Sequence, residues 1–147
     1  YESYTETQTI TTKQPINSGP STIIKTSFTF KDIYFIHFDR DGKITWIKEI
    51  DKLQTGESDE ILSFKHFLHN DMIYVIYNDF TDRHHLKIHK IDCTGSITTP
   101  INMKIHSKET LGGYYLVPSS CKQCGEGEFI AYANRFFKTR LVKYKVN

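Results

Sequence analysis

The amino-acid sequence predicts an all-β protein, and three observations indicate it. Residue types that suit a pleated, half-buried surface are abundant, with 18 Ile, 16 Thr, 10 Phe and 9 Tyr. Alanine, the strongest helix former, occurs only twice, at Ala131 and Ala133. Short apolar runs also recur from Ile23 onward with turn residues between them, as is typical of antiparallel β chains.

Length and composition predict one globular domain. The chain has 147 residues, of which 38% are hydrophobic and 24% are charged, and its formal net charge is +2. A chain of this length can bury a substantial core without a metal or a disulfide. The aromatic content and low net charge exclude an intrinsically disordered chain. No apolar run approaches the roughly 20 residues of a membrane-spanning helix, so we expect no membrane insertion.

The predicted organisation is an N-terminal arm followed by a single domain. Residues 1–20 are rich in Thr, Glu and Gln and end in a strong turn signal, so they form either an edge strand or a loose lead-in. Residues 21–147 form one all-β repeat domain, with units of roughly 21–58, 59–110 and 111–147. About ten antiparallel strands are expected, near 22–30, 32–38, 43–50, 61–68, 72–78, 86–92, 96–105, 113–117, 128–133 and 139–146. Residues 57–68 could add one helical turn before their strand.

A short motif occurs twice at an offset of 53 residues. Residues 38–45 and 91–98 both read apolar-Asp-x-x-Gly-x-Ile-Thr, with the acidic residues at Asp39 and Asp92. This pattern predicts a hairpin, because an Asp side chain can accept hydrogen bonds from nearby amides and Gly accepts the positive φ of the turn. A calcium loop is the alternative for Asp39, but its twelfth position would be Ile50 instead of the Glu required.

A second pair of segments matches at an offset of 56 residues. Residues 73–78 and 129–134 are both aromatic-containing strands that end in Asn. Repeating units of 53–56 residues with three or four short strands have the size of a propeller blade. Three units are too few to close a ring of the usual four to eight blades. We therefore expect a partial propeller, or the same hairpins stacked as a sandwich.

These motifs resemble a β-propeller-like repeat family of uncharacterised bacterial proteins. The resemblance rests on residues 32–39, on Gly42 to Ile50 with Trp46 on the return strand, and on residues 73–79. The similar segments follow one another in the same order as in that family, over roughly residues 26–146. The resemblance implies blades from the C-terminal portion of a cell-envelope protein, and it implies no activity or catalytic residue. The chain departs from the pattern in its small number of blades and in the presence of Cys121 and Cys124.

The segment Cys121-Lys122-Gln123-Cys124 is the one recognisable short motif with metal-binding or redox chemistry. A redox role would need a helix N-terminus next to the first Cys, but a flexible acidic stretch and a strand follow. A zinc site would need four ligands, and Cys93 is the only other cysteine. Cys121 and Cys124 thus remain weak metal candidates, and a hairpin loop with free or locally bridged thiols is favoured.

The histidines and the basic C-terminal segment have simpler interpretations. His85 and His89 would share a strand face about 13 Å apart, too far to bind one ion. The remaining histidines, among them His37, His66 and His69, could be grouped into a site only by the fold.

Residues 135–145 combine five positive charges with three aromatic residues, a composition that suits nucleic-acid binding. The alternation from Val142 to Val146, however, predicts a half-buried strand. Nucleic-acid binding is therefore not expected.

No catalytic, cofactor-binding or metal-binding residue is assigned, and no cofactor is expected. The sequence predicts a non-catalytic interaction or scaffold module that binds protein or glycan, with a location at the cell envelope or outside the cell. Trp46 and several tyrosines could contribute to such a face, although most should belong to the core. The alternative is a non-catalytic portion of a larger hydrolase-type enzyme. Unpaired strand edges of an incomplete ring also predict either a homodimer through sheet edges or an arm, residues 1–20, that blocks an edge.

Overall fold

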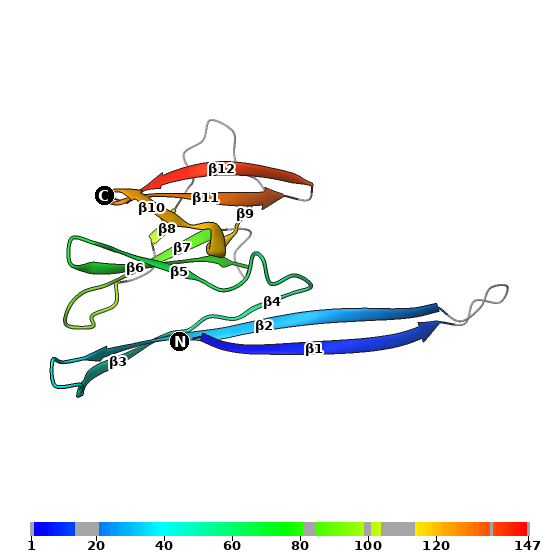
Figure 1. The fold of residues 1–147 in the computed structure, drawn as a ribbon, viewed down its shortest axis with the longest axis horizontal. Helices are drawn as coiled ribbons and strands as arrows, with labels where there is room; N and C mark the ends of the chain where they lie inside the picture. Colours follow the sequence, from blue (N-terminus) through cyan, green and yellow to red (C-terminus); the bar gives the residue numbers. More distant parts are fainter. Residues whose placement is uncertain are drawn as a thin grey trace.

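A computed structural model describes residues 2–13, 21–80, 85–98, 101–103, 114–135 and 137–146. Within these residues the protein is all-β, as the sequence predicted, and its strands pair antiparallel throughout. The strands form three four-stranded sheets, here called A, B and C in chain order. Figure 1 shows the sheets as three layers, with sheet B in the middle. The sheets do not close on one another.

Sheet A is built around one long strand. The central strand β2 (Ser21–Phe38) pairs with β1 (Glu2–Lys13) on one side. On its other side β2 pairs with β3 (Ile44–Ile50) and, nearer its own N-terminus, with β4 (Gln54–Gly56). The β1–β2 ribbon extends past the other two sheets (Figure 1). The N-terminal arm is thus an edge strand over residues 2–13, and the rest of the arm lies outside the described residues.

Sheet B is a meander of four neighbouring strands: β5 (Lys65–His69), β6 (Met72–Asp79), β7 (His85–Ile91) and β8 (Ile101–Met103). Six of the eight residues of β6 are buried, whereas β11 of sheet C alternates between buried residues and partly or fully exposed ones. A strand covered on one face alternates, while a strand covered on both faces is apolar throughout. The burial of β6 therefore identifies sheet B as the central layer.

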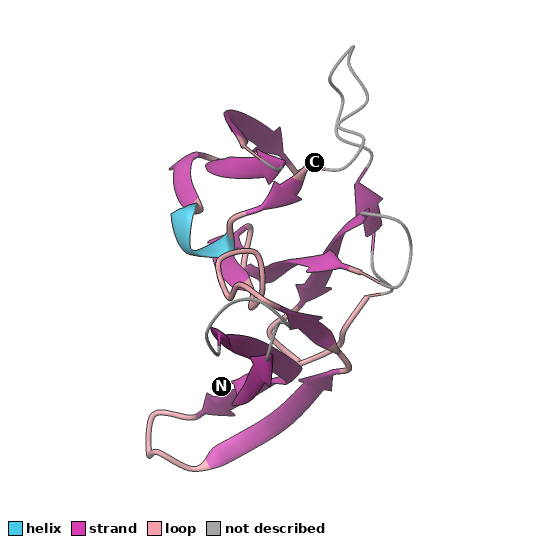
Figure 2. Cartoon of the chain, turned by 90° about the vertical axis from the view of Figure 1, so that its right-hand side faces the viewer, coloured by secondary structure: helices cyan, strands magenta, loops and turns pink. Residues whose placement is uncertain are grey.

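Sheet C contains β9 (Tyr115–Leu116), β10 (Lys122–Gly125), β11 (Glu128–Arg135) and β12 (Lys138–Lys145). β11 is central, with β12 on one side and both short strands on the other. A 3-10 helix, η1 (Pro118–Ser120), joins the two short strands and is the only helix among the described residues (Figure 2). No helix in the described part of the chain is long and apolar enough to cross a membrane.

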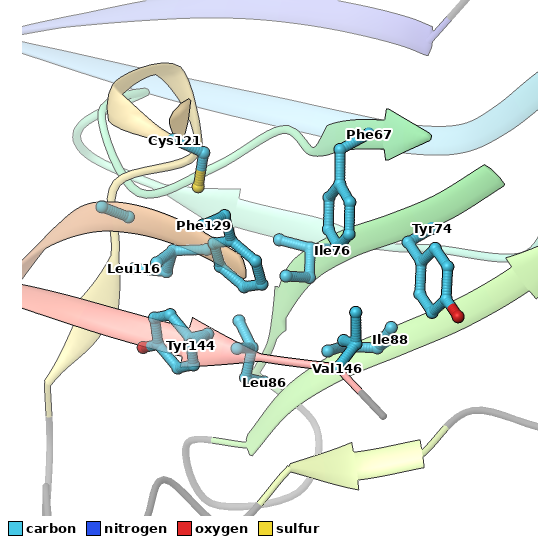
Figure 3. Close-up of a cluster of buried hydrophobic side chains, with 11 residues drawn as sticks. Phe67, Tyr74, Ile76, Leu86, Ile88, Leu116, Cys121, Phe129, Tyr144 and Val146 are labelled. Atoms are coloured by element: carbon cyan, nitrogen blue, oxygen red, sulfur yellow. The ribbon is translucent and has the colours of Figure 1, made fainter. Parts of the chain in front are cut away.

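Two hydrophobic clusters join the layers. One lies between sheets B and C and includes Ile76, Ile88, Leu116, Phe129 and Tyr144 (Figure 3). The other lies between sheets A and B, where Ile33 and Ile50 of sheet A meet residues of β6 and β7, namely Val75, Tyr77 and Ile91. Because neighbouring residues of a strand point to opposite faces, even-numbered residues of β6 face sheet C and odd-numbered residues face sheet A.

The two predicted Asp-x-x-Gly hairpins have the same geometry. In each, Oδ1 of the Asp accepts hydrogen bonds from the amides two and four residues later, at Asp41 and Lys43 after Asp39 and at Thr94 and Ser96 after Asp92. Gly42 and Gly95 share a φ of +79°. The hairpin prediction is confirmed, and the Asp39 carboxylate accepts hydrogen bonds from amides of its own turn.

Several predicted element boundaries were wrong. The expected strands at 22–30 and 32–38 are one strand, β2, because the chain passes through an irregularity in its pairing with β1 without leaving the sheet. The strand expected over 61–68 begins only at Lys65, and the helical turn expected nearby is a tight turn in which the Leu62 amide donates to Asp59 O. The short strands β4 and β10 were not predicted.

Candidate functional site

A groove with a volume of about 680 Å³ lies between sheets A and B. It lies where the β5–β6 turn and the end of β7 approach β2 and β3. Its lining comes from five strands and two turns, namely His37, Trp46, Leu68, His69, Asn70, Asp71, Ile73, Ile91, Asp92 and Cys93. Ligand sites in proteins are commonly hollows of this size with an apolar lining and a few polar groups.

Trp46 fixes the wall of the groove on the sheet A side. Its Nε1 donates a hydrogen bond to the carbonyl of Cys93 at 3.2 Å. The His37 ring stacks on the indole, with ring centres 5.2 Å apart and planes 14° apart. Gly95 packs so closely that a Cβ there would lie 2.8 Å from Trp46 Cδ2. Since neighbours hold the indole in this way, Trp46 shapes the groove and is not an open stacking platform.

The β5–β6 turn forms the opposite rim. Asn70 and Asp71 both have positive φ, at 49° and 57°, as a two-residue hairpin turn of the I′ type requires. Asn and Asp tolerate this conformation better than other non-glycine residues, which explains why they occupy the turn. The turn places their polar side chains beside His69 and the largely exposed Leu68 at the mouth of the groove.

The floor of the groove is aliphatic. Ile91 is fully buried and Ile73 is partly buried against the cluster between sheets A and B. The carboxylate of Asp92 accepts hydrogen bonds from amides of its own turn. Burial of an apolar group on this floor would be favourable, since each square ångström of apolar surface removed from water contributes about 25 cal/mol. The groove therefore combines an apolar floor with a polar rim.

A smaller, polar hollow of about 280 Å³ lies elsewhere between sheets A and B. Its lining includes Lys52, Tyr77 and an ion pair between Lys87 and Asp79. Burial lowers the pKa of Lys52, although its ion pair with Glu2 acts in the opposite direction. Burial, with Asp79 and Asp51 nearby, raises the pKa of Tyr77 to about 12. Lys52 pairs with Glu2, Lys87 with Asp79, and the Tyr77 hydroxyl with His89. Because these groups already have partners, we interpret the hollow as a structural polar cluster.

The two weak metal candidates lie in unlike surroundings. Cys121 is buried in the cluster between sheets B and C (Figure 3), and burial raises its pKa to about 12. Cys124 is exposed on β10, so the predicted hairpin loop is in fact a strand that follows a 3-10 helix. All three cysteines are free thiols. A thiol with so high a pKa is a poor nucleophile and a poor metal ligand at neutral pH.

The fold groups two of the dispersed histidines. His37 and His69 both line the groove, whereas His66 lies against Phe35 and Phe64. His89 is buried and shares a hydrogen bond of 3.0 Å with the Tyr77 hydroxyl. His84 and the side chain of His85 fall outside the described residues, so the predicted separation on β7 stays a prediction.

Among the described residues, one group of three potential metal ligands comes together: Asp32, Glu49 and Asp51. Asp32 accepts a hydrogen bond from the Lys52 amide, and Glu49 accepts one from the Tyr34 hydroxyl. Two of the three carboxylates are exposed. Exposed acidic residues of this kind need no metal ion, and they indicate only a patch of negative charge.

The basic C-terminal segment forms β12 with the predicted alternation. Tyr144 and Val146 are buried, while Lys143 and Lys145 are exposed and contact Glu128. Most of the tyrosines considered for a binding face are wholly or partly buried, and Tyr132 is the exposed one among them.

Few features of the sequence indicate the groove. Leu68 and Ile73 read as ordinary strand residues, and the Asn-Asp dipeptide at 70–71 indicated only a turn. Comparison of the chain with protein-family models, curated proteins and solved structures gives no match.

Proposed function

We propose that the protein is a non-catalytic binding module whose groove between sheets A and B holds a segment of another protein. The observation that carries this proposal is the aliphatic floor, whose accessible part belongs to the partly buried Ile73, beneath a polar rim. Such a floor suits an apolar side chain, and the rim at Asn70 and Asp71 suits the peptide groups beside it. The resemblance to bacterial repeat proteins supports a partner at the cell envelope.

The same geometry favours a peptide over a glycan. Sugars are generally held against an open aromatic face flanked by polar groups, because the ring presents apolar C–H groups to it. In this groove the only indole is engaged by His37 and Gly95. The exposed apolar surface at its mouth comes from Leu68, which suits an aliphatic or aromatic side chain of a peptide.

A peptide library displayed on phage, followed by calorimetry with the selected peptides, tests the proposal. We expect apolar-containing peptides that bind the wild-type chain and lose at least tenfold in affinity in Leu68→Asp. Leu53→Asp is the matched control, because Leu53 is equally exposed, at 62% against 64%, but lies outside the groove. Circular dichroism should show the same fold for both variants.

Three results would contradict the proposal. Binding that is lost equally in both variants would place the peptide elsewhere on the molecule. No peptide binding, together with binding on a glycan array that Leu68→Asp abolishes, would assign the groove to sugars instead. Silence in both assays would leave no role for the groove in binding.

A further inference from the structure

The stack of three sheets has two ends, and both expose apolar side chains. At the sheet A end these are Ile36, Phe38, Ile44 and Ile47, each between 45% and 55% exposed. At the sheet C end Tyr132 and Leu141 are paired across β11 and β12 and are 51% and 63% exposed. Contiguous exposed apolar residues on a sheet face commonly mark a surface that another protein covers.

The equivalent positions of sheet B indicate what kind of surface covers the sheet A end. Phe38 and Ile44 pair across the Asp39 turn, as Ile91 and Ile97 pair across the equivalent Asp92 turn. In sheet B this pair is packed against sheet A, and Ile91 is fully buried there. The pair Phe38–Ile44 thus occupies the positions that, one sheet later, lie beneath the preceding sheet.

The equivalent positions of sheet B likewise indicate what kind of surface covers the sheet C end. By the offset of 56 residues, Tyr132 corresponds to Ile76 and pairs with Leu141 as Ile76 pairs with Ile88. Ile76 and Ile88 are buried against sheet C. Tyr132 and Leu141 therefore occupy positions that, one sheet earlier, lie beneath the following sheet.

Two polar details also indicate incomplete ends. The side chain of Asn78 accepts a hydrogen bond from the Leu116 amide of the next sheet at 2.9 Å. The corresponding Asn134 has a buried Oδ1 with no hydrogen-bond partner among the described residues. At the other end, the Gly95 turn is packed against Trp46 of the preceding sheet, whereas the space beside Gly42 is open.

The two ends are also complementary in charge. On sheet A, the Glu49 carboxylate lies within 4.8 Å of those of Asp32 and Asp51. On sheet C, Lys143 and Lys145 are exposed and share the single carboxylate of Glu128, so that this group of three has a net positive charge. Opposite charges around an apolar contact favour one orientation of two surfaces over the others.

We propose that two copies of the chain associate head to tail, with sheet C of one copy on sheet A of the other. The contact continues between copies the face-to-face packing that joins A to B and B to C within one chain. It is heterologous, because unlike surfaces meet, and it can form twice between two copies. Two copies hold six such sheets, a number within the four to eight blades of closed propellers.

Sedimentation velocity of the 147-residue chain over a range of concentrations tests this proposal. We expect the wild-type chain to form dimers and Ile36→Lys and Leu141→Lys to be monomeric, because each places a charge at one of the two ends. Leu53→Lys is the control and should dimerise like wild type, since Leu53 lies at neither end. Circular dichroism confirms that the variants are folded.

Mixing the two monomeric variants distinguishes a head-to-tail contact from a symmetric one. The mixture retains one intact sheet C end and one intact sheet A end, so we expect dimers that contain one copy of each variant. Dimers that neither variant disrupts would assign association to strand edges and overturn the proposal. Monomeric wild-type chain at about 100 μM would also overturn it, with both ends then left for a different partner. Peptide binding in the groove is measured separately, so either proposal can fail alone.

Discussion

Trp46 of sheet A lies directly against Gly95 of sheet B, so that the turn of one sheet is seated on the indole of the preceding one. A Cβ added to Gly95 would come within 2.8 Å of Trp46 Cδ2 and 2.9 Å of Lys48 Cε. The Trp46 Nε1 hydrogen bond to Cys93 holds the same turn. This contact positions one wall of the groove.

Gly95→Ala and Gly42→Ala form a matched pair. Both glycines have a φ of +79°, so both variants incur the strain of a side chain in the left-handed region, about 1–2 kcal/mol. Only Gly95→Ala also forces a steric overlap with the indole, which should add about 1–3 kcal/mol. We expect urea denaturation to show the larger loss for Gly95→Ala. Equal losses would mean that Trp46 does not pack on the turn.

Asn78→Ala should be strongly destabilising. The Asn78 side chain donates to Ile61 O at 2.7 Å and to Leu116 O at 2.8 Å, and it accepts from Leu116 N. Its removal leaves buried backbone groups without partners, and we expect a loss of about 2–4 kcal/mol in the free energy of unfolding. Asn134→Ala is the control, because the Oδ1 of Asn134 has no such partner in the described part of the chain, and it should cost at least 1 kcal/mol less.

Glu2→Gln should loosen the edge strand β1. The Glu2 carboxylate forms an ion pair with the buried Lys52 ammonium and also accepts from the Ser63 hydroxyl. The substitution removes the carboxylate that balances the buried Lys52 charge and leaves Gln54 as a neutral hydrogen-bond acceptor, at a cost of about 3–5 kcal/mol. Glu6→Gln alters an exposed carboxylate on the same strand and should change stability by no more than about 0.5 kcal/mol. Amide hydrogen exchange of β1 would show whether the strand opens first, and equal exchange in both variants would contradict the role of the pair.

Thiol modification should separate the three cysteines. Cys93 and Cys124 are exposed, whereas Cys121 is buried and its pKa is raised to about 12. Because the thiolate is the reactive form, two thiols should react rapidly with an aromatic disulfide at pH 8. The third should react only as fast as the protein opens. Rapid reaction of all three would contradict the burial of Cys121.

Stability should decline in alkaline solution partly because of Cys121. The unfolded thiol loses its proton near its usual pKa of about 8.5–9, whereas the folded thiol keeps it until about pH 12. Between these values the unfolded state binds fewer protons than the folded state, so the free energy of unfolding falls as pH rises. The full effect is about 4 kcal/mol at 1.36 kcal/mol per unit of pKa. Cys121→Ala should flatten the decline relative to wild type, and Cys124→Ala should leave it unchanged.

The sequence alone determined the β character of the protein and its local turns. Ile, Thr and aromatic residues alternate with polar ones, and this period of two is a property of a single strand. Likewise, the Asp39 and Asp92 turns are closed by hydrogen bonds within five residues, so that their geometry could be inferred from a short motif.

The tertiary structure decided which surfaces are buried and where the groove opens. Strand β6 is covered on both faces only because sheets A and C lie on either side of it, and no local pattern specifies those neighbours. His37 and His69 meet at one groove although 32 positions separate them in the chain. Contacts of that kind depend on how whole sheets pack, because the energy of burial has no direction and is shared among many distant residues.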